Sequence, residues 1–426
     1  MKFMVVILIL LGLASKAYCQ DTKVIEGPVV LYSNIADQWG GHTFCYLLEG
    51  EKAVFWSATE RRDDGKLLTA LIGQHPKTGS GQEDALTKIP FEKPGLMGIN
   101  QPQMVRSSDG YIHIFIGITY EGKPGYNPGK IRYYRTKNPE DISELVDRTE
   151  LIPAESIYKD FHLRMNVGIS PDGQRMVLVI LAISDDGSVP FNTPVIFFGE
   201  KDGVDFTFKK PVKYSEAMSF FYPQVAATDD GIVLIGELWD NQDRTLTRLI
   251  HLDWSGKIIH QEDLPAEKDG RYMSFDLRPL DRNDWSKLGL YYNKQPKASK
   301  TGGHEFWEYD VKNHQLRLLN SVEDSISFLN AGKWFGAKFI NNPSMGKLYV
   351  WEGDIAGGGE ITKHPLPGAN MIKRGYQASA YMFAANMLQG SIKSEDGFYI
   401  ASDCFNPCRK PKTSGPSSFL MWRISR

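Results

Sequence analysis

The stretch Gln101-Pro102-Gln103-Met104-Val105-Arg106-Ser107-Ser108-Asp109-Gly110 has a second copy 121 positions later, Tyr222-Pro223-Gln224-Val225-Ala226-Ala227-Thr228-Asp229-Asp230-Gly231. In both copies a proline precedes the Asp-Gly pair by seven positions, and an apolar run follows it, at 111–115 and 232–235. Asp-Gly between two apolar runs is a strong signal for a β-hairpin turn. Each copy therefore predicts an inward-running strand, a tight turn and a returning strand.

Further copies of this hairpin fill the rest of the chain. Clear ones lie at 165–173 and 394–397, and weaker ones at 44–56, 275–292 and 334–351. The innermost strands are then expected near positions 42, 102, 165, 223, 275, 336 and 386. Seven units of 50 to 63 residues have the length of four-stranded propeller blades. The sequence predicts an all-β fold, a seven-bladed β-propeller built from four-stranded antiparallel blades.

The two ends of the mature chain also read as strands, at 24–32 and 418–424. A propeller commonly places its N- and C-terminal strands in one blade, so we expect these segments to share the last blade and close the ring. Helical signals are scarce, and only 139–145 favours a short helical turn. No linker divides the chain, so residues 20–426 are predicted to form one domain.

Residues 1–19 have the pattern of a signal peptide. Lys2 supplies the positive start, and the apolar run from Phe3 to Leu13 is too short to span a bilayer. Cleavage near Cys19 would release a secreted protein, either extracellular or periplasmic. Lipidation of Cys19 is left open as an alternative.

Composition and charge exclude some partners and leave others open. The formal net charge of −2 supplies no basic excess for phosphates, so nucleic acid is not expected as a partner. No later segment is apolar enough to span a membrane, and a monomer without cofactor or metal is expected, with a structural calcium ion left open. Cys404 and Cys408, in Cys-Phe-Asn-Pro-Cys, are predicted to form a local disulfide in an oxidising compartment, and two free thiols are the alternative.

Propellers bind ligands where the starts of the inner strands converge, which makes polar residues at those positions the candidates. His42, at the start of the first inner strand, is a candidate general acid or base, because imidazole titrates near neutrality. A histidine that only bonds a neighbouring loop is the alternative.

The other candidates are substrate-binding residues. His162, Arg164 and Asn166 alternate along the third inner strand, and period-two spacing places them on one face. An arginine there can hold a uronate carboxylate with two hydrogen bonds, although a structural polar network is an equally good interpretation. The remaining candidates stand near other inner strands or in a glycine-rich turn: Asn100, Gln101, Tyr222, Gln224 and His304.

Two segments resemble a known group of proteins. The stretch 41–50 with Ala53-Val54-Phe55-Trp56, and the stretch 109–114 with 133–142, resemble the first and second blades of secreted bacterial BNR-type propellers. That group includes α-L-rhamnosidases and ulvan lyases, and the resemblance covers roughly 41–145. It matches His42 to the histidine of the rhamnosidase-like members. The lyase-like members carry histidines where this chain has Gly98-Ile99-Asn100 and Thr119.

The resemblance implies a carbohydrate-active protein. The first hypothesis is a glycoside hydrolase on rhamnose- or uronate-containing polysaccharide, with His42 as acid or base and Arg164 and Asn100 orienting the substrate. The second is a polysaccharide lyase, in which a tyrosine or histidine abstracts the proton beside a neutralised uronate. The third is a propeller that binds sugar or protein without catalysis.

Overall fold

The computed structural model describes residues 24–35, 46–61, 67–99, 102–120, 129–153, 165–182, 193–214, 219–239, 245–264, 270–271, 275–281, 284–296, 303–322, 328–330, 332–340, 347–358, 361–367, 382–384, 397–404 and 417–425. Almost all of these residues lie in antiparallel strands, apart from turns and one short 3-10 helix, η1 (Thr149–Leu151). The described residues contain no helix that is long and apolar enough to cross a membrane.

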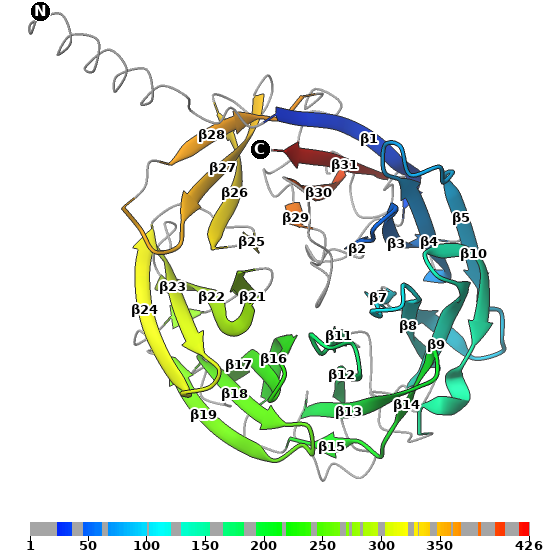
Figure 1. Ribbon diagram of the computed structural model, residues 1–426, viewed down its shortest axis with the longest axis horizontal. Coiled ribbons are helices and arrows are strands. Elements are labelled where there is room, and N and C mark those ends of the chain that lie inside the picture. Colours follow the sequence, from blue (N-terminus) through cyan, green and yellow to red (C-terminus); the bar gives the residue numbers. More distant parts are fainter. Residues whose placement is uncertain are drawn as a thin grey trace, which may run out of the picture.

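The strands form seven separate sheets that follow one another around a central axis (Figure 1). The first sheet contains β2 (Tyr46–Glu49), β3 (Ala53–Arg61), β4 (Leu67–Pro76) and β5 (Ala85–Pro90). The second contains β6 (Leu96–Ile99), β7 (Gln103–Arg106), β8 (Ile112–Tyr120), β9 (Gly129–Asn138) and β10 (Asp141–Asp147). The third contains β11 (Met165–Ile169), β12 (Arg175–Ala182), β13 (Thr193–Asp202), β14 (Asp205–Phe208) and β15 (Val212–Lys213).

The remaining sheets repeat this plan. The fourth contains β16 (Ser219–Ala227), β17 (Gly231–Trp239), β18 (Thr245–Asp253) and β19 (Ile258–Leu264). The fifth contains β20 (Gly270–Arg271), β21 (Phe275–Asp281), β22 (Asp284–Pro296), β23 (Gly303–Asp310) and β24 (Gln315–Val322). The sixth contains β25 (Phe328–Asn330), β26 (Lys333–Ile340), β27 (Lys347–Asp354) and β28 (Thr362–Pro365). The seventh contains β29 (Met382–Ala384), β30 (Gly397–Cys404), β31 (Ser417–Ser425) and β1 (Val24–Ile35).

This arrangement is a β-propeller. In each sheet one end of the strand order lies nearest the axis and the other end lies at the rim, as for β2 and β5 in the first sheet (Figure 1). In the seventh sheet the rim strand is β1, which pairs antiparallel with β31 from Val24 opposite Ser425 to Ile35 opposite Ser417. The two ends of the described chain therefore meet in one sheet.

Two expectations from the sequence are corrected. The sixth inner strand was expected near position 336, but the innermost strand is β25, and the expected segment forms the second strand, β26. The inner strand has three residues, Phe328–Asn330, too few to show an alternating pattern. The segment 139–145 forms a turn followed by β10 rather than a helical turn, because Asp141 pairs with Asn138 across the ladder.

The hydrophobic core lies between neighbouring sheets. Along β8, Ile114 packs against the first sheet, whereas the next residue, Phe115, packs against the third. Period-two alternation sends successive side chains to opposite faces, and here both faces are apolar because both are covered. Apolar clusters fill each interface from the first and second sheets through the fifth and sixth, and also join the seventh sheet to the first.

A buried ion pair ties the first sheet to the second. Glu140, in the turn between β9 and β10, accepts hydrogen bonds from the backbone N–H groups of Glu51 and Lys52, each at 2.7 Å. Its carboxylate also contacts the Nε of Arg106 at 2.5 Å. Glu140 adopts a left-handed φ of 50°, and both side chains of the pair are buried. A buried charge is tolerated only when it is paired and hydrogen-bonded, as this one is.

We expect Glu140→Gln to lower the free energy of unfolding by about 3 kcal/mol, because the amide Nε cannot accept a hydrogen bond and Arg106 loses its buried partner. Urea unfolding at pH 7 measures the change. Glu144→Gln is the matched control, since Glu144 is exposed and, among the described residues, pairs with Lys137 alone at the rim of the same sheet. This change should alter the free energy of unfolding by less than about 0.5 kcal/mol. Equal losses of unfolding free energy in the two variants would show that the ion pair of Glu140 does not join the first sheet to the second.

Candidate functional site

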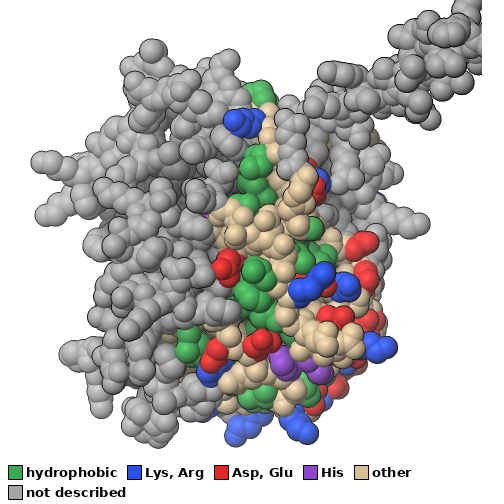
Figure 2. Space-filling view, turned by 90° about the vertical axis from the view of Figure 1, so that its left-hand side faces the viewer, with side chains coloured by type: hydrophobic (Ala, Val, Ile, Leu, Met, Phe, Trp, Pro, Cys, Tyr) green, Lys and Arg blue, Asp and Glu red, His purple; other side chains and the backbone are tan. Residues whose placement is uncertain are grey.

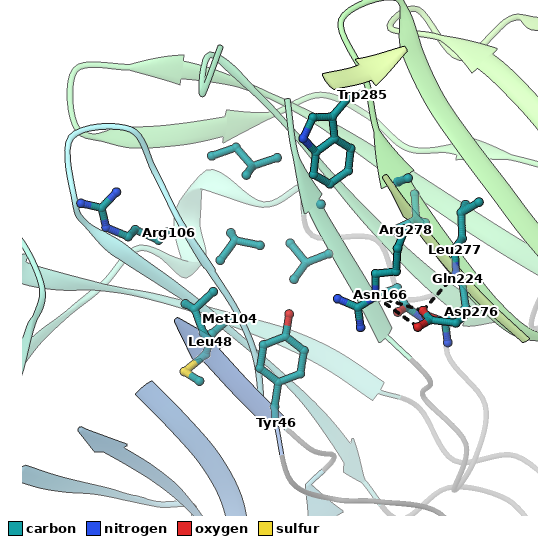
Figure 3. Close-up of a pocket in the computed structure, with 16 residues that line it drawn as sticks. Tyr46, Leu48, Met104, Arg106, Asn166, Gln224, Asp276, Leu277, Arg278 and Trp285 are labelled. Carbon is teal, nitrogen blue, oxygen red and sulfur yellow. Dashed lines mark hydrogen bonds and ion pairs between the residues drawn. The ribbon is translucent and has the colours of Figure 1, made fainter. Parts of the chain in front are cut away.

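One cavity opens on the central axis, where the innermost strands of the first five sheets converge (Figure 3). It encloses about 610 Å³ of space that includes open solvent. Apolar side chains form much of its wall, and the guanidinium of Arg106 is engaged by Glu140 and Glu51. The residues that can offer hydrogen bonds, charge or an indole to a ligand are Tyr46, Asn166, Gln224, Asp276, Arg278 and Trp285. Such a mostly apolar wall with a few polar groups is typical of small-molecule sites.

Strand periodicity places the charged pair at the cavity. Asp276 and Arg278 are two residues apart on β21 and so share a face, while Leu277 between them packs into the layer toward the fourth sheet. The Nε of Arg278 lies 3.1 Å from Asp276 Oδ1. This contact leaves the terminal Nη groups of Arg278 without a hydrogen-bond partner among the described residues.

Asp276 also joins the fifth sheet to the sixth. Its Oδ2 accepts a hydrogen bond from the backbone N–H of Leu329 in β25 at 3.1 Å, and its Oδ1 accepts one from the N–H of Leu277 at 3.0 Å. One carboxylate therefore holds Arg278 in place and fixes the short inner strand of the next sheet. Charge-assisted bonds of this kind are stronger than neutral ones.

Tyr46, at the start of β2, points its hydroxyl into the cavity (Figure 3). Burial raises the pKa of this phenol well above its usual range, and the positive charge of Arg278 opposes that shift only in part. Tyr46 is consequently a proton donor at neutral pH.

Asn166 and Gln224 are the predicted site residues that the structure brings together. Both line the cavity, on β11 of the third sheet and β16 of the fourth. The Nδ2 of Asn166 donates to the backbone carbonyl of Pro223 at 2.5 Å, so the amide also links the two sheets. The same contact occurs in the other copy of the repeat, where the Ser57 hydroxyl donates to the backbone carbonyl of Pro102 at 2.7 Å. In both copies a side chain of the preceding sheet binds the carbonyl of the repeat proline.

The other predicted site residues do not join this group among the described residues. His304 is buried on β23, the third strand from the axis, and does not line the cavity. Tyr222 lies on β16, and Cys404 on β30 opposite Ser418, but their side chains are outside the described part. The remaining candidates lie entirely outside the described residues: His42, Asn100, Gln101, His162, Arg164 and Cys408.

Sequence reasoning missed Tyr46, Asp276, Arg278 and Trp285. The first three stand on inner strands that the repeats had located, near positions 42 and 275. The alternation Asp276-Leu277-Arg278 was a usable signal, since polar residues two apart on an inner strand share its channel side. Trp285, on the second strand β22, carried no such signal.

A serine and a histidine also lie within hydrogen-bond distance at a separate place, but they form no active site. Ser107 Oγ is 3.1 Å from His113 Nε2, and the Tyr133 hydroxyl is 2.7 Å from His113 Nδ1. Ser107 and His113 are completely buried, and burial lowers the pKa of His113 to about 3. His113 is therefore a structural residue of β8.

In the described part of the chain no three His, Cys, Asp or Glu side chains are arranged to hold a metal ion. No model of a known protein family matches the sequence, and neither does any curated protein.

Solved structures similar to this chain are propellers of several kinds. The WD40 domain of SCAP from fission yeast is 10% identical with a TM-score of 0.49, over 95% of this chain and 98% of that one. Trypanosoma rangeli sialidase in complex with 2,3-difluorosialic acid is 10% identical with a TM-score of 0.47, over 94% of this chain, which spans 59% of the sialidase. A Dyadobacter fermentans protein of unknown function is 11% identical with a TM-score of 0.47, over 94% and 99% of the two chains. At these identities and scores the likenesses carry no argument about activity.

We expect Asp276→Asn to lower the free energy of unfolding by about 2 kcal/mol, because the Leu329 N–H and Arg278 both lose a charged acceptor. Urea unfolding measures the loss. Glu83→Gln, at an exposed side chain in the connection between β4 and β5, is the control and should leave the free energy of unfolding unchanged. An unchanged Asp276→Asn variant would show that the carboxylate does not join the two sheets.

Proposed function

We propose that this protein is a carbohydrate-active propeller that binds its sugar in the cavity on the axis. The observation that carries the proposal is the convergence of polar side chains from four sheets on one space, with the indole of Trp285 beside them. Sugars present hydroxyl groups in several directions and apolar ring faces. Hydrogen-bonding amides, a phenol and an aromatic ring match both features.

The charge at the cavity favours an acidic sugar. Arg278 holds its Nε toward Asp276, and its terminal Nη groups can bond a uronate carboxylate. Tyr46, kept protonated by burial, can donate to the same carboxylate or to a glycosidic oxygen. These groups support the uronate-containing polysaccharide that the family resemblance implies, for which Arg164 is the residue expected to hold the carboxylate.

In its finer form the proposal is hydrolysis of rhamnose- or uronate-containing polysaccharide by a secreted, seven-bladed propeller whose ring closes through the pairing of β1 with β31. His42 precedes Tyr46 by four positions and acts as the general acid or base. Asn100 and Arg164 orient the substrate together with Asn166 and Gln224.

Elimination is the second candidate, and one observation favours it. Tyr46 and Arg278 face the same cavity, and a lyase needs an arginine to neutralise the uronate carboxylate and a phenol to move a proton. Glycoside hydrolysis usually needs two carboxylic acids, whereas the described lining of the cavity contains one, Asp276.

The test is mass spectrometry of the products formed from a panel of rhamnose- and uronate-containing polysaccharides. We expect products that carry one added water, and their loss in His42→Ala. Unsaturated products would replace hydrolysis with elimination. No cleavage of any substrate, together with measurable binding, would leave a sugar-binding propeller without catalysis.

Arg278→Gln should weaken binding of uronate-containing oligosaccharide by roughly 10- to 100-fold and leave neutral oligosaccharide unchanged, since one charge-assisted contact contributes about 1.5–3 kcal/mol. Titration calorimetry measures both affinities. Arg278→Lys keeps the charge and should lose less, and Arg317→Gln at an exposed site on β24 should lose nothing. Equal losses for the two oligosaccharides would remove Arg278 as the group that binds the carboxylate.

A further inference from the structure

Three histidines meet where the fourth sheet packs against the fifth, away from the cavity. His251 on β18 and His260 on β19 are direct cross-strand partners, and His314 stands in the turn between β23 and β24. The ring of His314 lies 5.2 Å from that of His251 and 5.6 Å from that of His260, the latter nearly parallel. Histidine side chains gather in one patch on the face shown in Figure 2, with acidic side chains beside them.

One hydroxyl connects two of these rings across the interface. Tyr309 Oη lies 3.1 Å from His251 Nδ1 and 3.4 Å from His314 Nδ1. With both imidazoles neutral, the hydroxyl donates to one ring and accepts from the other. With both rings charged, each Nδ1 donates and the hydroxyl proton loses its acceptor. The contact therefore fits neutral imidazoles.

The surroundings of His251 oppose a positive charge. Its side chain is completely buried, and its Nε2 has no hydrogen-bond partner in the described residues. The pKa of His251 is lowered to about 4, mainly because the ring is buried and also because His314 and His260 lie nearby, while the charges of Asp230 and Asp253 oppose the shift. Among the other acidic groups, Glu262 contacts His260 Nε2 at 3.4 Å, and Asp310 follows Tyr309 on β23.

The same two sheets shape the cavity. Their inner strands, β16 and β21, carry Gln224 and the Asp276–Arg278 pair. A change in how the fourth sheet packs on the fifth at the histidines is transmitted through the shared apolar layer, which includes Leu249 and Tyr309. The histidine cluster is placed to influence the cavity without touching its ligand.

We propose that the cluster of His251, His260 and His314 forms a proton-operated latch between the fourth and fifth sheets, closed while the buried His251 is neutral and opened when His251 takes up a proton. The buried ring of His251, with its Nε2 unpaired among the described residues and its Nδ1 beside the Tyr309 hydroxyl, is the group that a proton would disturb. The latch is independent of which sugar the cavity binds.

The sign and size of the effect follow from linkage. The closed form has a His251 pKa of about 4 and the open form the ordinary value of 6.5, so the open form binds more protons between these values. Closure is thus lost as pH falls from 6.5 toward 4. Opening should be roughly 20-fold more favourable at pH 5 than at pH 7.

Hydrogen exchange measured by mass spectrometry at pH 7 and pH 5, corrected for the intrinsic exchange rate, tests the latch. We expect exchange across β18–β19 to rise roughly 20-fold at pH 5, with a smaller rise across β4–β5 of the first sheet. His251→Phe keeps the aromatic packing, removes the titrating group and should abolish the difference between the two segments. His75→Gln, at a histidine of β4 paired with Asp84, is the matched control and should behave as the wild type.

Two results would overturn the proposal: an equal rise in both segments, or a rise across β18–β19 that persists in His251→Phe. If that variant does not fold, His314→Asn serves instead, because asparagine tolerates the left-handed φ of 53° at this position. This variant removes the ring of His314, which lowers the pKa of His251. The rise in exchange across β18–β19 at pH 5 should therefore be smaller than in the wild type. A rise of the same size as in the wild type would also contradict the latch.

Discussion

In the described residues, each of the first five sheets has two apolar faces, and the neighbouring sheets in the ring cover them. Ile114 and Phe115, adjacent on one strand, are both completely buried because one faces the first sheet and the other the third. Burying such a side chain contributes about 1.5–3 kcal/mol, so the sheets depend on one another for their stability. The seventh sheet, in which β1 pairs with β31, also covers an apolar face of the first sheet. Phe419 of the seventh sheet packs there with Trp56 of the first.

Polar ties act at the same interfaces, where side chains from one sheet satisfy groups in the next. Glu140 accepts hydrogen bonds from two backbone N–H groups of the neighbouring turn. Asp205, the first residue of β14, pairs with Arg135 of β9 and with Arg148, which follows β10. Each tie is specific in geometry, whereas apolar packing alone tolerates sliding. We therefore regard the apolar layers as the source of stability and the buried polar contacts as what fixes the register between sheets.

The cavity results from the same geometry. Inner strands converge on the axis, so a residue on each of several sheets reaches one space, although the residues are far apart in the chain. The ion pair with Asp276 holds Arg278 in one orientation at the cavity. A side chain held in this way loses little further entropy when it makes another contact.

The sequence by itself determined the repeat, the all-β class and the places of most inner strands, because Asp-Gly turns and period-two patterns are local properties of the chain. It missed the sixth inner strand, since three residues from Phe328 to Asn330 carry no pattern. Only the tertiary structure decided that Tyr46 and Arg278 share a cavity, and that His251 and His314 meet across two sheets. Such meetings depend on the packing of whole sheets around the ring, and no local signal records which strand faces will oppose one another.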